Sequence, residues 1–331
     1  MPRKLASIIA ALIAAALAPA PAQAGSFSAI YAFGDSLSDV GNALAVTGFP
    51  ASPPYYNGRA SNGPNWVDKL SASLGLVGPV LPSLLPAIPS PPISGNDWAW
   101  ASATTGATGT LNPAPAVPTG LQQVGAFLAT HGAAPSGGLY TFTLGSNDLL
   151  NILEGISSPT GVADAALAEA QAIGALATAG AKTFIVALVP DLGKVPLIHA
   201  LAPGDQAAWD YASSLANTYN QALRSDLVGI AGVHVLDTFA WLDNAEKHPG
   251  QYGLINVADP CYSGAKVGAP GGTVCGSPDT FLFWDQLHPT TVVDGFLARD
   301  AVALLAPSPT PGAGLASLGL LLLVGIRWKR A

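Results

Sequence analysis

Short, mainly apolar runs alternate with longer amphipathic stretches along this chain of 331 residues. The runs have the pattern of strands that are buried on both faces of a parallel sheet. They lie at residues 30–33, 139–144, 182–189 and 233–239. Most stretches between them repeat apolar residues every three or four positions, as on one helix face. Helices are predicted over residues 65–74, 121–130, 163–179, 205–228 and 291–305. This alternation predicts a three-layer α/β/α sandwich around a central parallel sheet.

The first 24 residues have the pattern of a secretory signal peptide. Arg3 and Lys4 precede an apolar run over residues 5–17, and residues 22–24 form a small-x-small cleavage site. We expect cleavage after Ala24 and export of the remainder. The alternative is an uncleaved anchor, for which the run is short, because a membrane-spanning helix needs about 20 apolar residues.

The other end of the chain combines a proline-rich linker, an apolar stretch and a basic end. These occupy residues 307–312, 315–326 and 327–330. The order resembles the PEP-CTERM sorting tail of Gram-negative bacteria, although the linker lacks a literal Pro-Glu-Pro. The resemblance implies an exosortase-like sorting protease as a partner, and delivery to the periplasm, the cell surface or the extracellular matrix. The alternative is a plain membrane anchor whose basic end stays cytoplasmic.

The segment between these ends, residues 25–306, has the length of one large α/β domain. It is acidic, because five of the 13 basic residues lie in the terminal segments and all 20 acidic residues lie between them. A negative net charge disfavours nucleic acid or anionic lipid as the main partner. The sequence leaves the oligomeric state open.

Two cysteines, Cys261 and Cys275, lie in a segment that is rich in glycine and proline. In an exported chain we expect them to form a disulfide. A zinc site would need more Cys or His ligands, and the sequence clusters none. We therefore predict no metal.

The segment around Ser36 is the first candidate for chemistry. The apolar run at residues 30–33 stops at Gly34, and Asp35, Ser36 and Leu37 follow. This pattern predicts a buried strand that ends in a sharp turn. Ser36 then lies at the strand's carboxyl end, where open α/β sheets build their sites. A glycine before the serine permits backbone angles that other residues avoid.

Two later segments supply partners for a serine. Residues 145–148 read G-S-N-D, and Asp285 precedes His288 by three positions. Together with G-D-S-L these blocks resemble the SGNH (GDSL-type) hydrolases over about residues 28–306. Further agreement lies at residues 58–66, 189–193 and 283–285. The resemblance implies the flavodoxin-like α/β/α fold of that family.

The resemblance also implies an exported serine esterase or lipase that needs no cofactor. A serine hydroxyl is a weak nucleophile and needs a base. His288 is expected to be that base, with Asp285 orienting it. The substrate would be a small-molecule or lipid ester, carried as an acyl-enzyme on Ser36 and released by water.

Three donors for the reaction's oxyanion follow from the same resemblance. They are the backbone N–H of Ser36, the backbone N–H of Ser102 and the side-chain amide of Asn147. In the block that contains Ser102, Ala101 and Ser102 replace two usual glycines. That departure supports one alternative, an inactive binding or matrix protein. The other is an acyltransferase that passes the acyl group to an alcohol or a sugar.

Residues 77–93 contain six prolines, which exclude a helix or a central strand. This apolar loop either roofs an acyl-binding pocket or packs on the surface of the domain.

Overall fold

The structure, a computed structural model, describes residues 27–84, 95–106, 117–264 and 267–306. The signal peptide and the sorting tail lie outside these ranges, so both stay predictions. Most of the proline-rich loop lies outside them as well. Among the described residues, no helix is both long and apolar enough to cross a membrane.

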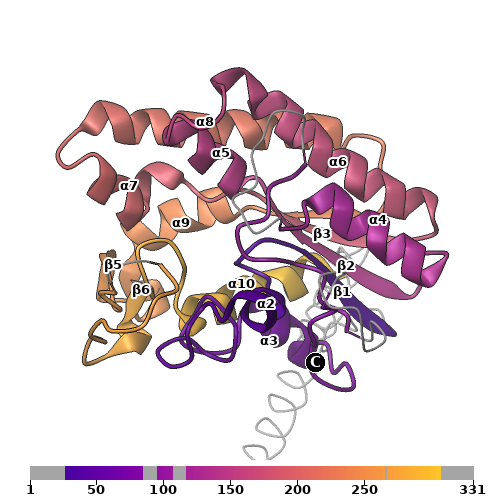
Figure 1. The fold of residues 1–331 in the computed structure, drawn as a ribbon, viewed down its shortest axis with the longest axis horizontal. Coiled ribbons are helices and arrows are strands. Elements are labelled where there is room, and N and C mark those ends of the chain that lie inside the picture. Colours follow the sequence, from indigo (N-terminus) through magenta and orange to yellow (C-terminus); the bar gives the residue numbers. More distant parts are fainter. Residues whose placement is uncertain (1–26, 85–94, 107–116, 265–266, 307–331) are drawn as a thin grey trace, which may run out of the picture. The chain divides into compact units, whose positions relative to one another are not determined.

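A four-stranded parallel sheet forms the centre of the domain (Figure 1). Its strands are adjacent in sequence order: β1 (Ala29–Gly34), β2 (Gly138–Thr143), β3 (Thr183–Ala187) and β4 (Val233–Leu236). At their carboxyl ends, Gly34 is paired with Thr143, Thr143 with Ala187, and Ala187 with Leu236. Polar residues that follow the strands therefore gather at one edge of the sheet.

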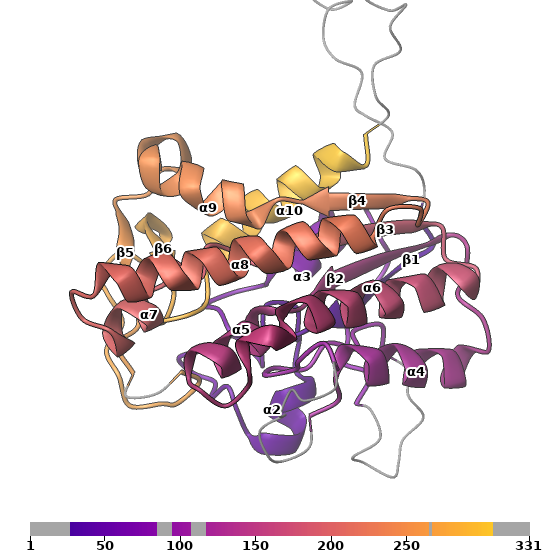
Figure 2. The ribbon, with the colours of Figure 1, turned by 90° about the horizontal axis from the view of Figure 1, so that it is seen from above.

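Helices cover both faces of this sheet, which confirms the predicted three-layer sandwich (Figure 1). One face carries α4 (Gly120–His131), α6 (Val162–Thr178) and α8 (Gln206–Asp226). Figure 2 shows these three helices side by side. The other face carries α3 (Trp66–Ser73) and α10 (Thr291–Leu304), which pack against each other.

Shorter elements escaped the sequence pattern. They are the helices α2 (Asn42–Thr47), α5 (Ser146–Leu153), α7 (Pro196–Leu201) and α9 (Thr238–Lys247), and the strands β5 (Asn256–Pro260) and β6 (Phe281–Phe283). The strand predicted over residues 233–239 is too long. It ends at Leu236, because the Asp237 side chain accepts the N–H of Ala240 and begins α9.

A small second sheet and a disulfide lie in the last part of the domain's sequence. Strands β5 and β6 pair in parallel, and Cys261 is bonded to Cys275, as predicted. The ring of Tyr262 stacks on Trp284 at 5.6 Å, and Tyr55 meets Tyr262 edge-on at the same distance. Trp284 of this aromatic cluster directly precedes Asp285 in the chain.

We expect the disulfide to contribute measurably to the free energy of unfolding. Replacing both Cys261 and Cys275 by serine should lower the free energy of unfolding by about 3 kcal/mol, because a cross-link over 14 residues restricts the unfolded chain. Urea unfolding of the oxidised protein and of the double variant measures the difference. Reduced wild-type protein is the control, and equal midpoints for oxidised protein and variant would contradict the prediction.

Candidate active site

The nucleophile's strand is fixed at its end by a close approach between backbones. The N–H and the carbonyl of Gly34 bond to the side-chain amide of Gln123, both at 2.9 Å. The φ of Gly34 is 153°, and a Cβ there would lie 2.3 Å from Oγ1 of Thr143. Only glycine fits this position. The N–H of Asp35 then bonds to the carbonyl of Thr143 at 3.0 Å, which leaves Ser36 just beyond the sheet.

Ser36, His288 and Asp285 lie in hydrogen-bonding contact. Nε2 of His288 is 2.8 Å from Oγ of Ser36. Nδ1 of His288 is 2.9 Å from Oδ2 of Asp285. The other carboxylate oxygen accepts the backbone N–H groups of Leu287 and His288, at 2.8 and 2.7 Å. The geometry thus brings together the three residues that the sequence proposed as a triad.

Charge attraction within this buried pair shifts both pKa values. Burial alone would raise the pKa of Asp285 and lower that of His288. The attraction and the hydrogen bonds between the two groups outweigh burial. The pKa of Asp285 therefore falls below its ordinary value, and the pKa of His288 rises above its own. The protonated form of the His288 imidazole is therefore more stable than that of an ordinary histidine.

Tyr55 is a site residue that the sequence analysis missed. Its hydroxyl donates to Oδ2 of Asp285 at 2.7 Å and accepts the N–H of Gly268 at 2.9 Å. Gly268 lies in the segment that the disulfide closes. Tyr55 stands in the proline-containing loop before α3, where no local pattern marks it for this contact. It gives Asp285 one more donor and ties it to the disulfide loop.

Asn147 lies in the first turn of α5, directly after β2. Its Nδ2 donates to the carbonyl of Ala103 at 2.9 Å. A side-chain amide carries two N–H bonds, and this contact uses one. Asn147 also lines the same pocket as Ser36 and His288. The second N–H is thus in a position from which it can reach a ligand.

Ser102 occupies the third position of a turn over residues 100–103, closed by a bond from the Ala103 N–H to the Trp100 carbonyl at 3.0 Å. Its φ is 68°, a conformation that this position of a type II turn requires and that glycine adopts most easily. The serine keeps the backbone course of the usual glycine. Ser102 is exposed and lies outside the described residues that line the pocket.

An apolar pocket opens beside Ser36 and His288. About 900 Å³ of space that is free of protein atoms lies in the pocket and its mouth, and part of this space is open solvent. Its walls come from the ends of β3 and β4, from α9 and from α10. They include the side chains of Leu188, Leu192, Leu236, Trp241, Leu242 and Leu297. Among the described residues, no group of three or more His, Cys, Asp or Glu is arranged to hold a metal ion.

Several buried carboxyl groups lie around the site. Burial raises the pKa of Asp35 to about 7, that of Asp148 to about 6, and those of Glu169 and Asp294 to about 8. The hydroxyl of Tyr219 donates to Oε2 of Glu169 at 2.5 Å, which offsets only part of the burial effect. These groups favour their neutral forms inside the folded protein.

Glu169 should therefore make the protein less stable as the pH rises. Its pKa of about 8 in the folded state exceeds its ordinary value of 4.5, so the folded state binds the proton more tightly than the unfolded state. The resulting stability is complete below pH 4.5 and is lost as the pH rises through about 8. Glu169→Gln should flatten this decline in Tm between pH 5 and pH 8. Glu154→Gln, on the surface, is the control, and an unchanged slope in the Glu169 variant would refute the assignment.

Comparison with known proteins identifies the family of the chain. A sequence model of the GDSL-like Lipase/Acylhydrolase family matches residues 30–300. The phosphatidylcholine-sterol acyltransferase of Aeromonas hydrophila is 27% identical over 84% of this chain and 90% of its own length. Esterase EstA of Pseudomonas aeruginosa is 30% identical over 90% of this chain, which spans 50% of that protein.

Among solved structures, the acetylxylan esterase Axe2 of Geobacillus stearothermophilus is similar with a TM-score of 0.43 and 13% identity. The match covers 86% of this chain and 97% of that one. It is too distant to bear on the substrate. The match of the family model extends from β1 into α10 and contains Ser36, Asn147, Asp285 and His288. The chain therefore belongs to the GDSL-like lipase/acylhydrolase family.

Proposed function

We propose that this protein is an exported esterase or lipase that cleaves carboxylic esters through an acyl-enzyme on Ser36. The contact that carries the proposal is the 2.8 Å approach of His288 Nε2 to the Ser36 hydroxyl, with the opposite ring nitrogen held by Asp285. This is the arrangement that a serine nucleophile needs, because its proton must be removed as it attacks. The reaction that we propose uses no cofactor.

In the first half-reaction, Oγ of Ser36 attacks the ester carbonyl carbon and its proton passes to Nε2 of His288. Asp285 stabilises the imidazolium that forms. The negative charge that develops on the carbonyl oxygen is stabilised by the N–H groups of Ser36 and Ser102 and by the Asn147 amide. The tetrahedral intermediate then collapses. The alcohol leaves with the proton from His288, and the acyl group stays on Ser36.

In the second half-reaction, a water molecule takes the place of the alcohol. His288 removes its proton as the oxygen attacks the acyl carbon. The same three donors stabilise the second oxyanion. The carboxylic acid leaves, and His288 returns the proton to Oγ of Ser36.

The apolar pocket supports an acyl chain as the part of the substrate that it binds. It adjoins Ser36 and His288, and most of the surface of its walls is apolar. Apolar surface that leaves water on binding contributes about 25 cal/mol per Å². Esters with a long apolar acyl group, including lipid esters, therefore suit this site better than acetates.

Acyl transfer is the second candidate. The observation that favours it is the similarity to the Aeromonas acyltransferase, which extends over 90% of that protein. Chemically it differs only in the second half-reaction, where an alcohol or a sugar hydroxyl replaces water. Supplying glycerol with the ester and measuring the ratio of new ester to free acid separates the two.

An inactive binding or matrix protein is favoured only by Ala101 and Ser102. The positive φ of Ser102 retains the turn that a glycine would make, which supports its backbone N–H as a donor. Export is supported by the disulfide, since such bonds persist in oxidising compartments. We infer that the N-terminal segment that ends at Ala24 is a signal peptide for export. We infer that the C-terminal tail is a surface-sorting signal that an exosortase-like protease recognises.

Ser36→Ala should abolish cleavage of p-nitrophenyl esters without changing Tm, because it removes one oxygen that is outside the core. A fluorophosphonate probe should label wild-type protein at Ser36 and leave the variant unlabelled. Ser73→Ala, on the exposed side of α3, is the control and should keep both properties. Labelling at another serine, or activity in the Ser36 variant, would refute the proposed nucleophile.

The pocket predicts a preference for longer acyl chains. From acetate to octanoate kcat/KM should rise, since each buried methylene contributes about 0.8 kcal/mol. Leu242→Trp should fill the pocket, lowering kcat/KM for octanoate by roughly tenfold or more and that for acetate by less than about threefold. Leu201→Trp, on the exposed side of α7, is the matched control. An equal loss for both esters would show that Leu242 does not border the acyl chain.

A further inference from the structure

Asp39 is a buried carboxylate that the proposed reaction does not use. It is 1% exposed and accepts four backbone N–H groups. Oδ1 lies 2.7 Å from the nitrogens of both Gly41 and Asn42. Oδ2 lies 3.0 Å from the nitrogen of Ala43 and 2.8 Å from that of Ala101. The first three donors are local, at the start of α2, whereas Ala101 belongs to a distant segment.

The bond to Ala101 holds the turn that presents Ser102. Ala101 is the second residue of the turn over residues 100–103. On its far side, the carbonyl of Ala103 accepts the amide of Asn147. The turn is therefore held from one side by the loop that follows Ser36 and from the other by Asn147. Asn147 takes part in this chain of hydrogen bonds, Ser102 lies in the turn that the chain holds, and Ser36 precedes Asp39 by three residues in the same loop.

We propose, on the basis of the proposed function, that Asp39 is a positioning residue that sets the spacing between the Ser36 and Ser102 donors. Such donors act when they lie about 2.7–3.1 Å from the developing oxyanion. A turn that drifts away from the nucleophile's loop loses that distance. The loss would fall on the transition state and not on binding of the resting ester.

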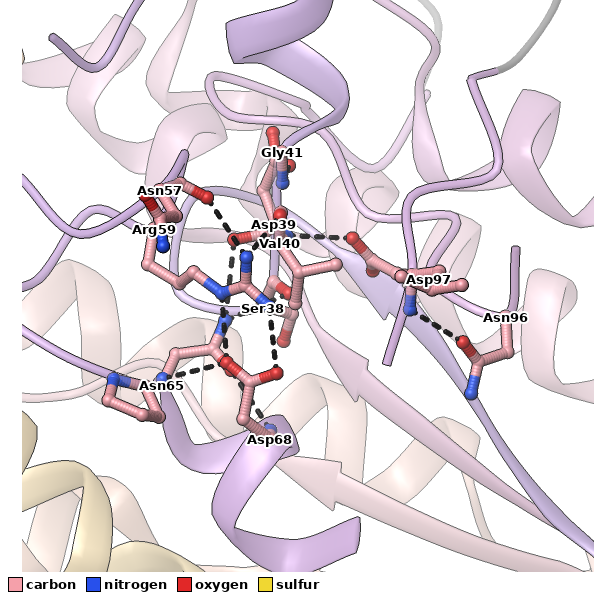
Figure 3. Close-up of polar contacts among 12 residues, drawn as sticks. Ser38, Asp39, Val40, Gly41, Asn57, Arg59, Asn65, Asp68, Asn96 and Asp97 are labelled. Carbon is pink, nitrogen blue, oxygen red and sulfur yellow. Dashed lines mark hydrogen bonds and ion pairs between the residues drawn. The ribbon is translucent and has the colours of Figure 1, made fainter. Parts of the chain in front are cut away.

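Separate contacts also hold the loop that follows Ser36 (Figure 3). The N–H of Val40 bonds to Asp97 at 2.8 Å, and its carbonyl accepts Nη1 of Arg59 at 2.6 Å. The guanidinium group of Arg59 also donates to both carboxylate oxygens of Asp68, each at 2.9 Å. These contacts support the loop without touching Ala101. They allow loop rigidity to be tested apart from the position of the turn.

Two substitutions break the Asp39–Ala101 bond from opposite ends. Asp39→Asn keeps the side-chain volume, but its amide group supplies only one acceptor oxygen for the four N–H donors. Ala101→Pro removes the N–H itself, and proline is favoured at the second position of a type II turn. Each variant should lower kcat for a p-nitrophenyl ester by about tenfold to a hundredfold, with KM changed by less than about threefold.

The double variant supplies the decisive comparison. If both substitutions act through one bond, Asp39→Asn with Ala101→Pro should be no slower than the slower single variant. Amide hydrogen exchange of Ala103, whose buried N–H closes the turn, should also be faster in both single variants than in the wild type. Independent, multiplying losses of kcat in the double variant would overturn the proposal.

Asp68→Asn is the matched control, because it weakens the anchoring of Arg59 beside the same loop and leaves the Ala101 bond intact. It should lower Tm and keep kcat within about threefold of wild type. A loss of kcat as large as that of Asp39→Asn would mean that loop rigidity alone matters, which overturns the proposal. Wild-type protein that cleaves no ester would refute the proposed function and this role together. Active wild-type protein with unimpaired Asp39 and Ala101 variants would refute this role alone.

Discussion

The close approach of β1 and β2 at their carboxyl ends is the constraint on which the site depends. Gly34 lies against Thr143 with no room for a Cβ, and the next N–H of the chain bonds to the same threonine's carbonyl. The chain must then turn away from the sheet at Asp35. Ser36 and Asn147 follow neighbouring strands, so this contact brings the proposed nucleophile and one of its proposed donors to the same edge.

The parallel register has a further effect on electrostatics. Carboxyl groups placed beneath that edge are removed from water, and burial shifts Asp35, Asp148 and Glu169 toward their neutral forms. Asp285 is equally buried, yet its pKa falls. Its Oδ1 accepts the N–H groups of Leu287 and His288, and its Oδ2 faces Nδ1 of an imidazole that can take a proton. The surroundings thus favour the charged form of Asp285, whereas they raise the pKa values of its buried neighbours.

The sequence was informative where the structure depends on residues that are close together in the chain. Apolar runs placed the four strands of the sheet, and Ser36, Asp285 and His288 could be named because each stands in a short, recognisable block. The predicted strand over residues 233–239 was too long, because apolar Phe239 extends the run whereas the side chain of Asp237 begins a helix. The contacts of Tyr55 with Asp285 and of Asp39 with Ala101 join residues 230 and 62 positions apart. No periodicity or composition encodes such pairings, which depend on the completed fold.

The 252 positions between Ser36 and His288 also bear on how the protein is made. A ribosome completes β1 early, but the imidazole reaches the sheet only after nearly all of the domain has been translated. Until then Ser36 is an ordinary hydroxyl, with no neighbour to take its proton. The contact between Ser36 and His288 therefore cannot form on a chain that is still being synthesised, wherever that chain later folds.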